Sequence, residues 1–390
     1  MIHIINMNED EWISAKQAQE RLGIRAQTLY AYVSRGQLRV QPHPSDSRRS
    51  LYRAADVDDL AARKGRSRKL ADVASAAIAW GEPVLSSAIT TVRAGRFYYR
   101  GQDAVRLSDD HDLEAIALLL LAQDDAPAGQ ADRPAPPRLP DVRQRLCHIL
   151  AQRASDAPAM LGSSAAAIAD EARLILDMMA DAAAGSCGSG PIHERLAAAW
   201  KAPHGPDIIR RMLVLIADHE LNASTFAARV TASTGASLAA SVLAGLTALS
   251  GPRHGGHSKV VRRFAAEAKL HGTREAVRER LMEGRSLPGF GHPLYPQGDI
   301  RAATLLSLVD VPEPLAELRA AARELADVEP NVDFAMVAAC DAFGLPEDAP
   351  FAIFAAARSA GWIAHAIEQG QTGKLIRPRA RYIGLEPEEI

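Results

Sequence analysis

Long stretches rich in alanine and leucine run through most of this chain, and they constrain its fold more than any other feature. Alanine loses no side-chain entropy in a helix, and leucine loses little. Aromatic residues make up only 5% of the sequence. We therefore predict a mainly α protein in which sheet is minor. The stretches expected to be helical are 113–121, 165–184, 208–216, 238–249, 315–326, 332–343 and 352–368.

The length and composition indicate an ordinary globular protein with more than one domain. The chain has 390 residues, of which 47% are hydrophobic and 24% charged, enough to bury sizeable cores. Its three cysteines, Cys147, Cys187 and Cys340, form no CxxC pair, so neither a disulfide framework nor a zinc site is expected. The N-terminus lacks the pattern of a signal peptide, and no apolar run reaches the ~18 residues of a membrane span. We expect a soluble, cytoplasmic protein without a bound metal.

The first 60 residues have the pattern of a small winged helical unit. Ser14 can cap a helix that ends at Leu22, because a serine oxygen accepts a hydrogen bond from the first free N–H groups. A second helix is expected at 26–35, with apolar residues at helical spacing. Alternating residues at 48–53 then predict one strand of a basic hairpin, and a third helix opens near Asp56.

This N-terminal stretch is also locally basic, although the whole chain has a net charge of −2. Between residues 16 and 53 there are eight basic and two acidic side chains, giving 8 − 2 = +6. The acidic residues are Glu20 and Asp46. The basic residues are Lys16, Arg21, Arg25, Arg35, Arg39, Arg48, Arg49 and Arg53.

Two polar stretches suggest how the chain is divided. The charged segment 63–69 is typical of a linker or an exposed helix end. We therefore place one domain at 1–70 and a second at 71–390. The proline-rich stretch 124–140 is interpreted as a surface loop inside the larger domain.

Three short motifs interrupt the helical body and place an ionisable residue beside glycine or proline. The first, 250–257, carries His254 between glycines; the second, 288–293, carries His292; the third, 330–334, places Asp333 in the first turn of an apolar helix. Each motif alone has a structural explanation, because histidines occur in glycine turns and an aspartate in a first turn stabilises the helix dipole.

Taken together and in this order, the three motifs resemble those of the citrate synthase family. The similarity extends to an early segment at 88–103, to Asp218-His219-Glu220-Leu221-Asn222-Ala223-Ser224-Thr225, and to a C-terminal signature between 357 and 379. It covers about residues 84–390. The resemblance implies a two-lobed helical fold in which a smaller lobe, at about 254–335, is inserted in a larger one. The active site would lie between the lobes, and family members close that cleft on oxaloacetate.

The resemblance also implies a reaction, the condensation of acetyl-CoA or another short acyl-CoA with oxaloacetate. Removing a weakly acidic methyl proton requires a carboxylate base and a donor that stabilises the enolate oxygen. Asp333 matches the base and His254 the donor. His292 matches the residue that polarises the oxaloacetate carbonyl and protonates the alkoxide. Hydrolysis of the citryl thioester then makes the reaction irreversible.

The residues that match the family's substrate-binding positions are His219, Asn222, Arg301, Arg358 and Arg377. Arginine suits a dicarboxylate because its planar fork pairs two oxygens at once. The position of Arg377 is one that the family contributes from the neighbouring subunit, so a homodimer is implied. The resemblance implies no tightly bound cofactor, since the CoA thioester is a co-substrate.

The chain departs from the family pattern on the CoA side. The HGG motif continues with His257, Ser258 and Lys259 where many members have Ala-Asn-Glu, and Pro296 stands where a basic residue often contacts a CoA phosphate. The family's DPR-like triplet is Asp299-Ile300-Arg301. These changes leave the acid–base residues intact and leave the choice between acetyl- and propionyl-CoA open.

The segment from residue 11 to 64 resembles the winged helix-turn-helix modules of MerR-type and excisionase-type proteins. Such a helix can enter a major groove while arginines of the wing contact phosphate or the minor groove. Small winged units also serve as protein–protein or dimerisation modules. The candidate DNA-contacting residues are Gln27, Thr28, Tyr30, Arg35, Arg48, Arg49 and Arg53.

Two hypotheses of different classes follow. In the first, the chain is a working acyltransferase, a citrate or 2-methylcitrate synthase or more remotely a citryl-CoA-cleaving relative, and the N-terminal module localises or regulates it. In the second, the synthase-like body senses oxaloacetate or CoA for a DNA-binding transcriptional regulator. The presence of Asp333 with His254 and His292 favours the enzyme, because arginines alone could bind oxaloacetate. The winged module and the altered CoA side favour the sensor.

Overall fold

The computed structural model describes residues 12–24, 28–29, 32–33, 37–44, 46–61, 85–123, 133–252, 254–380 and 382–385. The chain divides into two compact units, Met1–Ser86 and Ser87–Ile390. The sequence-based boundary near residue 70 and the predicted linker at 63–69 fall outside the described residues. So do residues 124–132 of the predicted proline-rich loop, while residues 133–140 form neither helix nor strand.

The N-terminal unit combines short helices with a three-stranded antiparallel sheet in the order β1-β3-β2. Ser14 caps the first helix as predicted, and its hydroxyl accepts the N–H of Gln17 at 3.3 Å. Gly23 ends this helix at φ 60°, in the left-handed region that glycine tolerates. Residues 54–61 are helical again. The named elements are β1 (Trp12–Ser14), α1 (Ala15–Leu22), β2 (Val40–His43) and β3 (Asp46–Arg53).

A core of its own holds the N-terminal unit together. Ile13 and Tyr52 face each other across the β1–β3 pair, and both are buried. Leu22 packs into the same cluster from α1, and Val57 packs into it from the helical segment 54–61. Burial of such side chains contributes roughly 1.5–3 kcal/mol each, so this small unit has the apolar contacts that an independent module needs.

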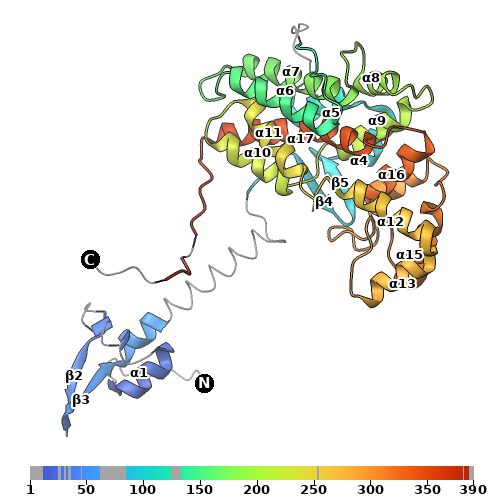
Figure 1. Ribbon diagram of the computed structural model, residues 1–390. Helices are drawn as coiled ribbons and strands as arrows, with labels where there is room; N and C mark the ends of the chain where they lie inside the picture. The colour runs from blue at the N-terminus through green and yellow to red at the C-terminus, as the bar shows by residue number, and fades with distance from the viewer. Residues whose placement is uncertain are drawn as a thin grey trace, which may run out of the picture. The chain divides into compact units, whose positions relative to one another are not determined.

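The larger unit is almost entirely helical, as predicted, after a small meander of three strands (Figure 1). The predicted helices at 113–121, 165–184, 238–249 and 315–326 coincide with α5, α7, α11 and α15. The elements are β4 (Thr90–Arg93), β5 (Arg96–Tyr99), β6 (Gln102–Asp103), α4 (Ala104–Asp110), α5 (Leu113–Leu121), α6 (Val142–Asp156), α7 (Ala165–Ala184), α8 (Ile192–Ala199), α9 (Pro206–Ile216), α10 (Ala223–Ser233), α11 (Leu238–Leu249), α12 (His257–His271), α13 (Thr273–Met282), α14 (Ile300–Leu306), α15 (Leu315–Ala326), α16 (Val332–Ala342) and α17 (Ala349–Thr372).

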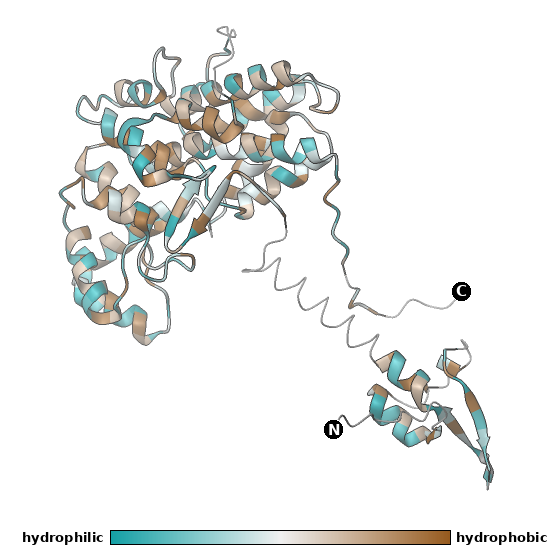
Figure 2. Cartoon of the chain, turned by 180° about the vertical axis from the view of Figure 1, so that it is seen from behind, coloured by the Kyte–Doolittle hydropathy of each residue, from teal (hydrophilic) through white to brown (hydrophobic). Residues whose placement is uncertain are grey.

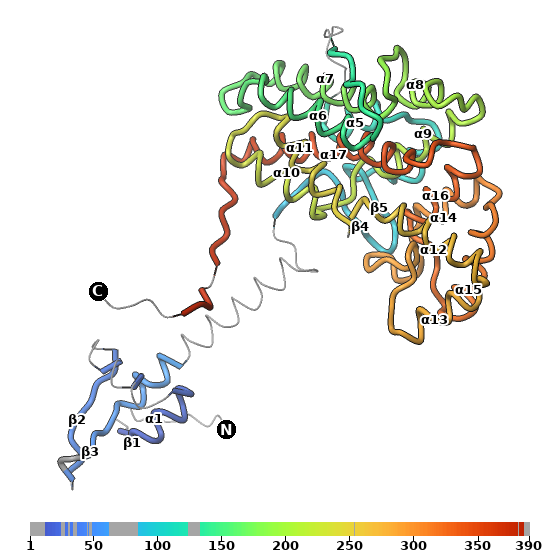
Figure 3. The backbone as a smooth tube through the Cα atoms, viewed as in Figure 1, coloured from blue at the N-terminus to red at the C-terminus, as the bar shows by residue number. Residues whose placement is uncertain are grey.

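The helices of this unit form two groups. The larger group surrounds α17, which packs against α5, α7, α9, α10 and α11. In the smaller group α12 packs against α13 and α16, and α13 against α15, and this group lies to one side of the body (Figure 3). The predicted inserted lobe at about 254–335 stays a prediction; α12, α13 and α15 fall within these bounds, and α16 extends to Ala342.

Helix α17 is the central element because nearly all of its surface is covered. Its buried residues include Trp362 and a run of alanines that let neighbouring helices approach closely. A helix that is apolar on all sides is stable only when other helices surround it. Most other helices of the unit carry hydrophobic and hydrophilic residues together (Figure 2). Among the described residues, no helix combines the length and apolarity that crossing a membrane would require.

Candidate active site

The loop that carries His292 is joined directly to the start of the helix that carries Asp333. Gly291 N–H donates to Glu329 O at 2.9 Å, and Asn331 N–H donates to Gly289 O at 2.8 Å. Gly289 has φ 84°, and a Cβ there would lie 2.9 Å from a Val261 methyl group. Only glycine fits both constraints. The second and third motifs of the sequence therefore form one structural unit.

At the centre of the site His219 and His292 lie edge to face. Their ring centroids are 5.5 Å apart and their planes cross at 87°. His219 Nε2 is 2.7 Å from the Tyr295 hydroxyl. The Arg301 guanidinium covers the Tyr295 ring at 5.2 Å and makes two hydrogen bonds to Asp299, of 2.9 and 2.7 Å. All of these groups except His292 are buried. The loop before α14 and the loop after α9 thus meet in one polar cluster.

The histidines of the site are neutral at physiological pH. Burial lowers the pKa of His254 to about 4, with Arg358 adding to the effect. Burial and the charge of Arg301 lower the pKa of His292 to about 4 as well. The pKa of His219 falls well below its usual value for the same reasons. Neutral imidazole can donate from one nitrogen and accept at the other.

His292 has a defined tautomer. The N–H of Leu294 donates to its Nδ1 at 3.2 Å, so Nδ1 carries the lone pair. The ring proton of the neutral form is then on Nε2, which can donate to a ligand oxygen. The glycine-rich loop therefore supplies a neutral donor rather than a cation.

Arg301 and Arg358 are both buried but are held in different ways. Asp299 neutralises Arg301, and the pair keeps the pKa of Asp299 low although burial alone would raise it. Arg358 donates from Nε to Ile216 O at 2.9 Å and lies over the Phe354 ring at 4.9 Å. No carboxylate of a described residue lies within ion-pair distance of Arg358. Burial lowers its pKa to about 10, and its Nη atoms remain for an anionic ligand.

Asp333 lies in the first turn of α16. Asn331 caps the helix by accepting the N–H groups of Asp333 and Phe334 at 3.1 and 3.4 Å. Within the described part of the chain, no donor contacts the Asp333 carboxylate. Burial raises the pKa of this carboxyl group, while the charges of His257, Arg301 and Arg358 oppose the rise. A carboxylate short of hydrogen bonds in a buried site is a stronger base than one in water.

His254 is held by a hydroxyl group. Its Nε2 lies 2.9 Å from Ser224 Oγ, which also accepts the indole N–H of Trp362 at 3.1 Å. Ser224 Oγ is 2.7 Å from Asn222 Oδ1. The ring of His254 meets Phe354 edge to face, with centroids 6.4 Å apart. Nδ1 is therefore the nitrogen that is left for a ligand.

The structure brings the side chains of six of the eight predicted site residues of the larger unit into mutual side-chain contact or electrostatic interaction. These are His219, His254, His292, Arg301, Asp333 and Arg358. Asn222 instead uses its side chain within its own loop: Oδ1 caps α10 and Nδ2 donates to His219 O at 3.3 Å. It therefore orients the loop that carries His219.

Arg377 lies elsewhere. It is exposed, in the segment that follows α17 and leaves the helical body (Figure 1). No carboxylate of a described residue pairs with it.

Two residues at which the chain departs from the family's CoA side lie next to site residues. His257 begins α12, and its Nδ1 is 3.1 Å from His254 O. Pro296 is exposed and follows Tyr295 in the sequence.

Sequence reasoning did not single out Tyr295, Ser224, Trp362 or Phe354. Tyr295 contacts His219, and Ser224 and Phe354 contact His254, from 30 to 100 positions away in the sequence. Trp362 reaches the site through Ser224, 138 positions away. Ser224 stood inside a motif that had been recognised, and Tyr295 follows His292 by three residues. In the sequence, the only signal for these four supporting residues is their position in or beside a recognised motif.

The candidate DNA-contacting residues of the N-terminal unit are only partly described. Gln27, Tyr30, Arg35 and the side chain of Arg48 lie outside the described residues. Thr28 is exposed in a helical segment.

The arginines that are described have acidic partners. Arg49 pairs with Asp46 at 3.5 Å and Arg53 with Asp56 at 3.8 Å. Asp56 also binds Arg39. Asp46 and Asp56 therefore compensate part of the local positive charge, and Asp56 lies just beyond residues 16–53.

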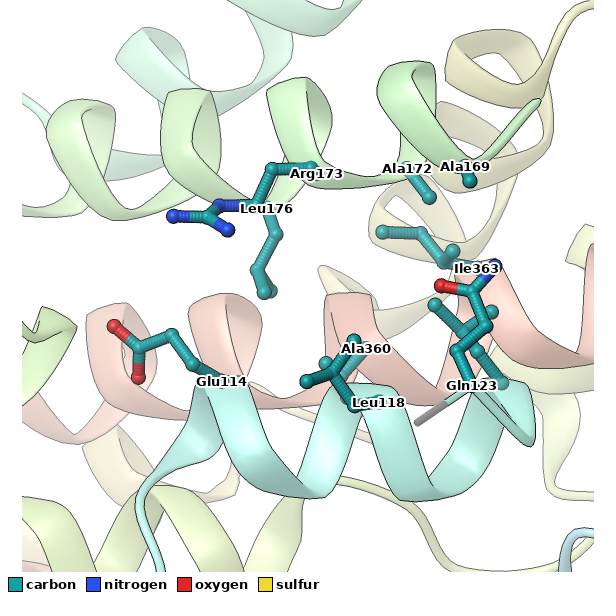
Figure 4. A pocket seen from close by; sticks show the side chains of 11 residues that line it. Glu114, Leu118, Gln123, Ala169, Ala172, Arg173, Leu176, Ala360 and Ile363 are labelled. Carbon is teal, nitrogen blue, oxygen red and sulfur yellow. The ribbon is translucent and has the colours of Figure 1, made fainter. Parts of the chain in front are cut away.

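A separate apolar pocket lies between α5 and α7, with α17 behind it (Figure 4). Ala360 and Ile363 contribute from α17, and Glu114 and Arg173 stand at its polar end. None of the predicted site residues lines it. It lies on a different face of α17 from Arg358, so its apolar lining does not mark the chemical site.

Comparison with known proteins shows the relationships of this chain. The family model "Citrate synthase, C-terminal domain" matches residues 78–379. Citrate synthase 2 of Bacillus subtilis is 34% identical over 200 residues, covering 48% of this chain and 54% of that protein. The 2-methylcitrate synthase 2 of Corynebacterium glutamicum is 32% identical over 191 residues, covering 46% and 50%. The matched region thus spans about half the length of these relatives.

A solved structure agrees over a longer part of the chain. It is the ternary complex of the Thermoplasma acidophilum citrate synthase with carboxymethyl coenzyme A and oxaloacetate. Its TM-score is 0.67 at 23% identity, and the superposition covers 79% of this chain and 95% of that one. The larger unit therefore has the fold of that protein.

Proposed function

The chain belongs to the citrate synthase family, and we propose that it condenses acetyl-CoA or another short acyl-CoA with oxaloacetate. The products would be citrate or an alkyl citrate and free CoA. No tightly bound cofactor is needed, since the CoA thioester is consumed as a substrate. The observation that carries this proposal is Asp333, a partly buried carboxylate with no hydrogen-bond donor among the described residues and with a pKa above its usual value.

Oxaloacetate would be held by the arginines. Arg358 offers its Nη atoms without a competing carboxylate among the described residues, and Arg301 brings a second charge that Asp299 fixes in place. A buried guanidinium pairs a carboxylate more strongly than an exposed one. His219 would complete this side, with its ring oriented by Tyr295 and its backbone by Asn222.

The chemistry would then proceed in three steps. Asp333 takes a proton from the methyl carbon next to the thioester, while Nδ1–H of His254 donates to the developing enolate oxygen. The enolate carbon attacks the carbonyl carbon of oxaloacetate, and Nε2–H of His292 stabilises and then protonates the alkoxide. Water finally hydrolyses the citryl thioester and CoA leaves as a thiol. The neutral state of both histidines supports their roles as donors.

A homodimer would complete the carboxylate site. Arg377 is exposed, away from the site residues of its own chain, and we propose that it reaches the site of a neighbouring subunit. Leu375 is also exposed in this segment, which suits a segment that is covered by a second copy. The three free thiols of Cys147, Cys187 and Cys340 accord with a location in the reducing cytoplasm.

A thiol-release assay tests the enzymatic proposal. Purified full-length protein is mixed with acetyl-CoA or propionyl-CoA, with and without oxaloacetate, and free CoASH is followed with a thiol reagent. We expect release that depends on oxaloacetate, and the faster thioester identifies the acyl preference. Release from no short acyl-CoA, despite oxaloacetate binding, would favour the regulator hypothesis instead.

We further propose that the N-terminal unit is a winged helix-turn-helix module that contacts DNA. Supporting this, β2 and β3 form a hairpin between two helical segments, and Thr28 is exposed. The ion pairs of Arg49 with Asp46 and of Arg53 with Asp56 favour a modest affinity for DNA, because these aspartates neutralise part of the positive charge that would bind phosphate. A gel shift on random-sequence DNA should be weakened by Arg48→Ala/Arg49→Ala. Unchanged retardation would exclude a contact through the hairpin.

A further inference from the structure

One face of α17 contacts three successive residues of the segment that leads to His219. Arg358 Nε donates to Ile216 O at 2.9 Å, Gly361 N–H donates to Ala217 O at 3.1 Å, and His365 Nε2 is 3.0 Å from Asp218 Oδ2. Residues 358, 361 and 365 share a helical face because they are three and four positions apart. The helix thus fixes residues 216–218 one after another.

The direction of the His365 hydrogen bonds can be assigned. Arg229 Nη1 lies 3.3 Å from His365 Nδ1, and a guanidinium can only donate. Nδ1 therefore accepts, and the ring proton lies on Nε2, pointing at Asp218. Arg229 is itself held by Glu368 at 2.7 Å and by Gln369 at 3.1 Å. His365 and Arg229 are both buried, so these bonds are shielded from water.

Asp218 and Glu220, on either side of His219, are tied to the first strand of the meander. Thr90 Oγ1 donates to Asp218 Oδ2 at 2.5 Å, and Val92 N–H donates to Glu220 Oε1 at 2.7 Å. Glu220 has φ 51°, a left-handed conformation that is unfavourable for a residue with a side chain. The contacts to β4 and α17 stabilise this conformation, and the side chain of His219 is thereby directed to Tyr295.

We propose that His365, oriented by Arg229, is a positioning residue that fixes His219 for oxaloacetate through the carboxylate of Asp218. The identity of the ligand as oxaloacetate rests on the proposed function. The positioning itself concerns the backbone of residues 216–220 and holds whatever the ligand is. His365 is not a catalytic residue, because Asp218 stands between it and the site.

Two substitutions separate positioning from simple packing. His365→Gln keeps a donor and an acceptor on one side chain and can bridge Arg229 to Asp218. His365→Leu fills similar space but leaves both groups without a partner. Ser359→Ala is the matched control, because Ser359 is buried in α17 and, among the described residues, its hydroxyl bonds only to Ala356 O of the same helix.

The first measurement is hydrogen–deuterium exchange of ligand-free full-length protein. We expect His365→Leu to speed exchange of amides in 216–222 about tenfold or more, with 315–326 in α15 unchanged as an internal reference. His365→Gln and Ser359→Ala should match the wild type. This measurement needs no activity, so it decides the positioning claim even if no condensation is found.

The second measurement is steady-state kinetics. His365→Leu should raise KM for oxaloacetate about tenfold or more, with KM for the acyl-CoA within about twofold of the wild type, and His365→Gln should restore it. Unchanged exchange in 216–222 for His365→Leu would overturn the proposal. Equal defects in His365→Leu and His365→Gln would overturn it too, because packing alone would then explain them.

Discussion

Ser224 Oγ lies 2.9 Å from His254 Nε2, and the direction of this hydrogen bond decides which nitrogen of the histidine carries the proton. The hydroxyl has one proton and two acceptors in reach, His254 and Asn222 Oδ1. Asn222 Oδ1 already accepts the N–H groups of Ser224 and Thr225. In the structure the hydroxyl donates to Asn222 Oδ1. The proposed enolate donor needs the ring proton on Nδ1, which requires the hydroxyl to donate to His254 Nε2 instead.

Ser224→Ala should therefore lower kcat about tenfold to a hundredfold, with KM for oxaloacetate little changed. It should also cost about 1–3 kcal/mol of stability, because the buried indole N–H of Trp362 loses its acceptor. Trp362→Phe is the control, since it removes the indole hydrogen bond to Ser224 and leaves the Ser224–His254 contact in place. Comparison of kcat and thermal unfolding in the two variants separates tautomer control from loss of stability. Equal kcat in Ser224→Ala and wild type would contradict the assignment.

Gly361 is expected to tolerate no side chain. A Cβ there would lie 2.4 Å from Asp218 Oδ1 and 2.6 Å from Ala217 O, both in the segment that carries His219. Gly361→Ala should destabilise the protein by about 1–3 kcal/mol through overpacking and raise KM for oxaloacetate. Gly370→Ala in the same helix is the matched control, because its Cβ would meet only Met160 Cε at 3.6 Å. Denaturant unfolding in which Gly361→Ala is as stable as Gly370→Ala would refute this account.

The pH dependence should separate the base from the histidines. Burial raises the pKa of Asp333 above the usual value of 3.8, whereas the pKa of His254 and His292 is lowered to about 4. Asp333 must be ionised to accept a proton, so kcat/KM for the acyl-CoA should fall as pH drops through its raised pKa. Oxaloacetate binding does not require the ionised Asp333 carboxylate, so it should not fall together with kcat/KM through that pKa. Simultaneous loss of binding and turnover would contradict the assignment.

Subunit complementation tests the role of Arg377. Arg377→Ala and Asp333→Asn should each be inactive. A mixed dimer of the two would hold one intact site, with Asp333 from one chain and Arg377 from the other. Random mixing after subunit exchange should then restore about a quarter of the wild-type sites. Arg379→Ala is the control, since it lies in the same exposed segment and should retain activity. No recovery on mixing would place Arg377 outside the neighbouring site.

Much of the fold could be predicted because the helices are dictated by local patterns. The bounds of α7 and α11 follow from serine caps before alanine-rich runs, with Ser164 and Ser237 accepting the first N–H groups. The catalytic candidates could be found because glycine and proline isolate them in recognisable motifs. Each of these signals consists of residues that lie within a few positions of one another in the sequence.

The supporting contacts could not be predicted because they join distant parts of the chain. Nothing near His365 in the sequence shows that Arg229 orients it or that Asp218 accepts its proton. Likewise Arg53 counted toward a basic surface until the structure paired it with Asp56. Asn222 was assigned to the substrate by resemblance, whereas its side-chain atoms cap α10 and hold the His219 backbone.

The central claim is that Asp333 is the base that removes a proton from the acyl-CoA methyl group. The direct test is CoASH release by Asp333→Asn beside Asp341→Asn, an aspartate of the same helix that pairs with Arg262. We predict a loss of kcat of about a hundredfold or more for Asp333→Asn, with oxaloacetate still bound, and near-normal release for Asp341→Asn. Oxaloacetate-dependent release at the wild-type rate by Asp333→Asn would contradict the account.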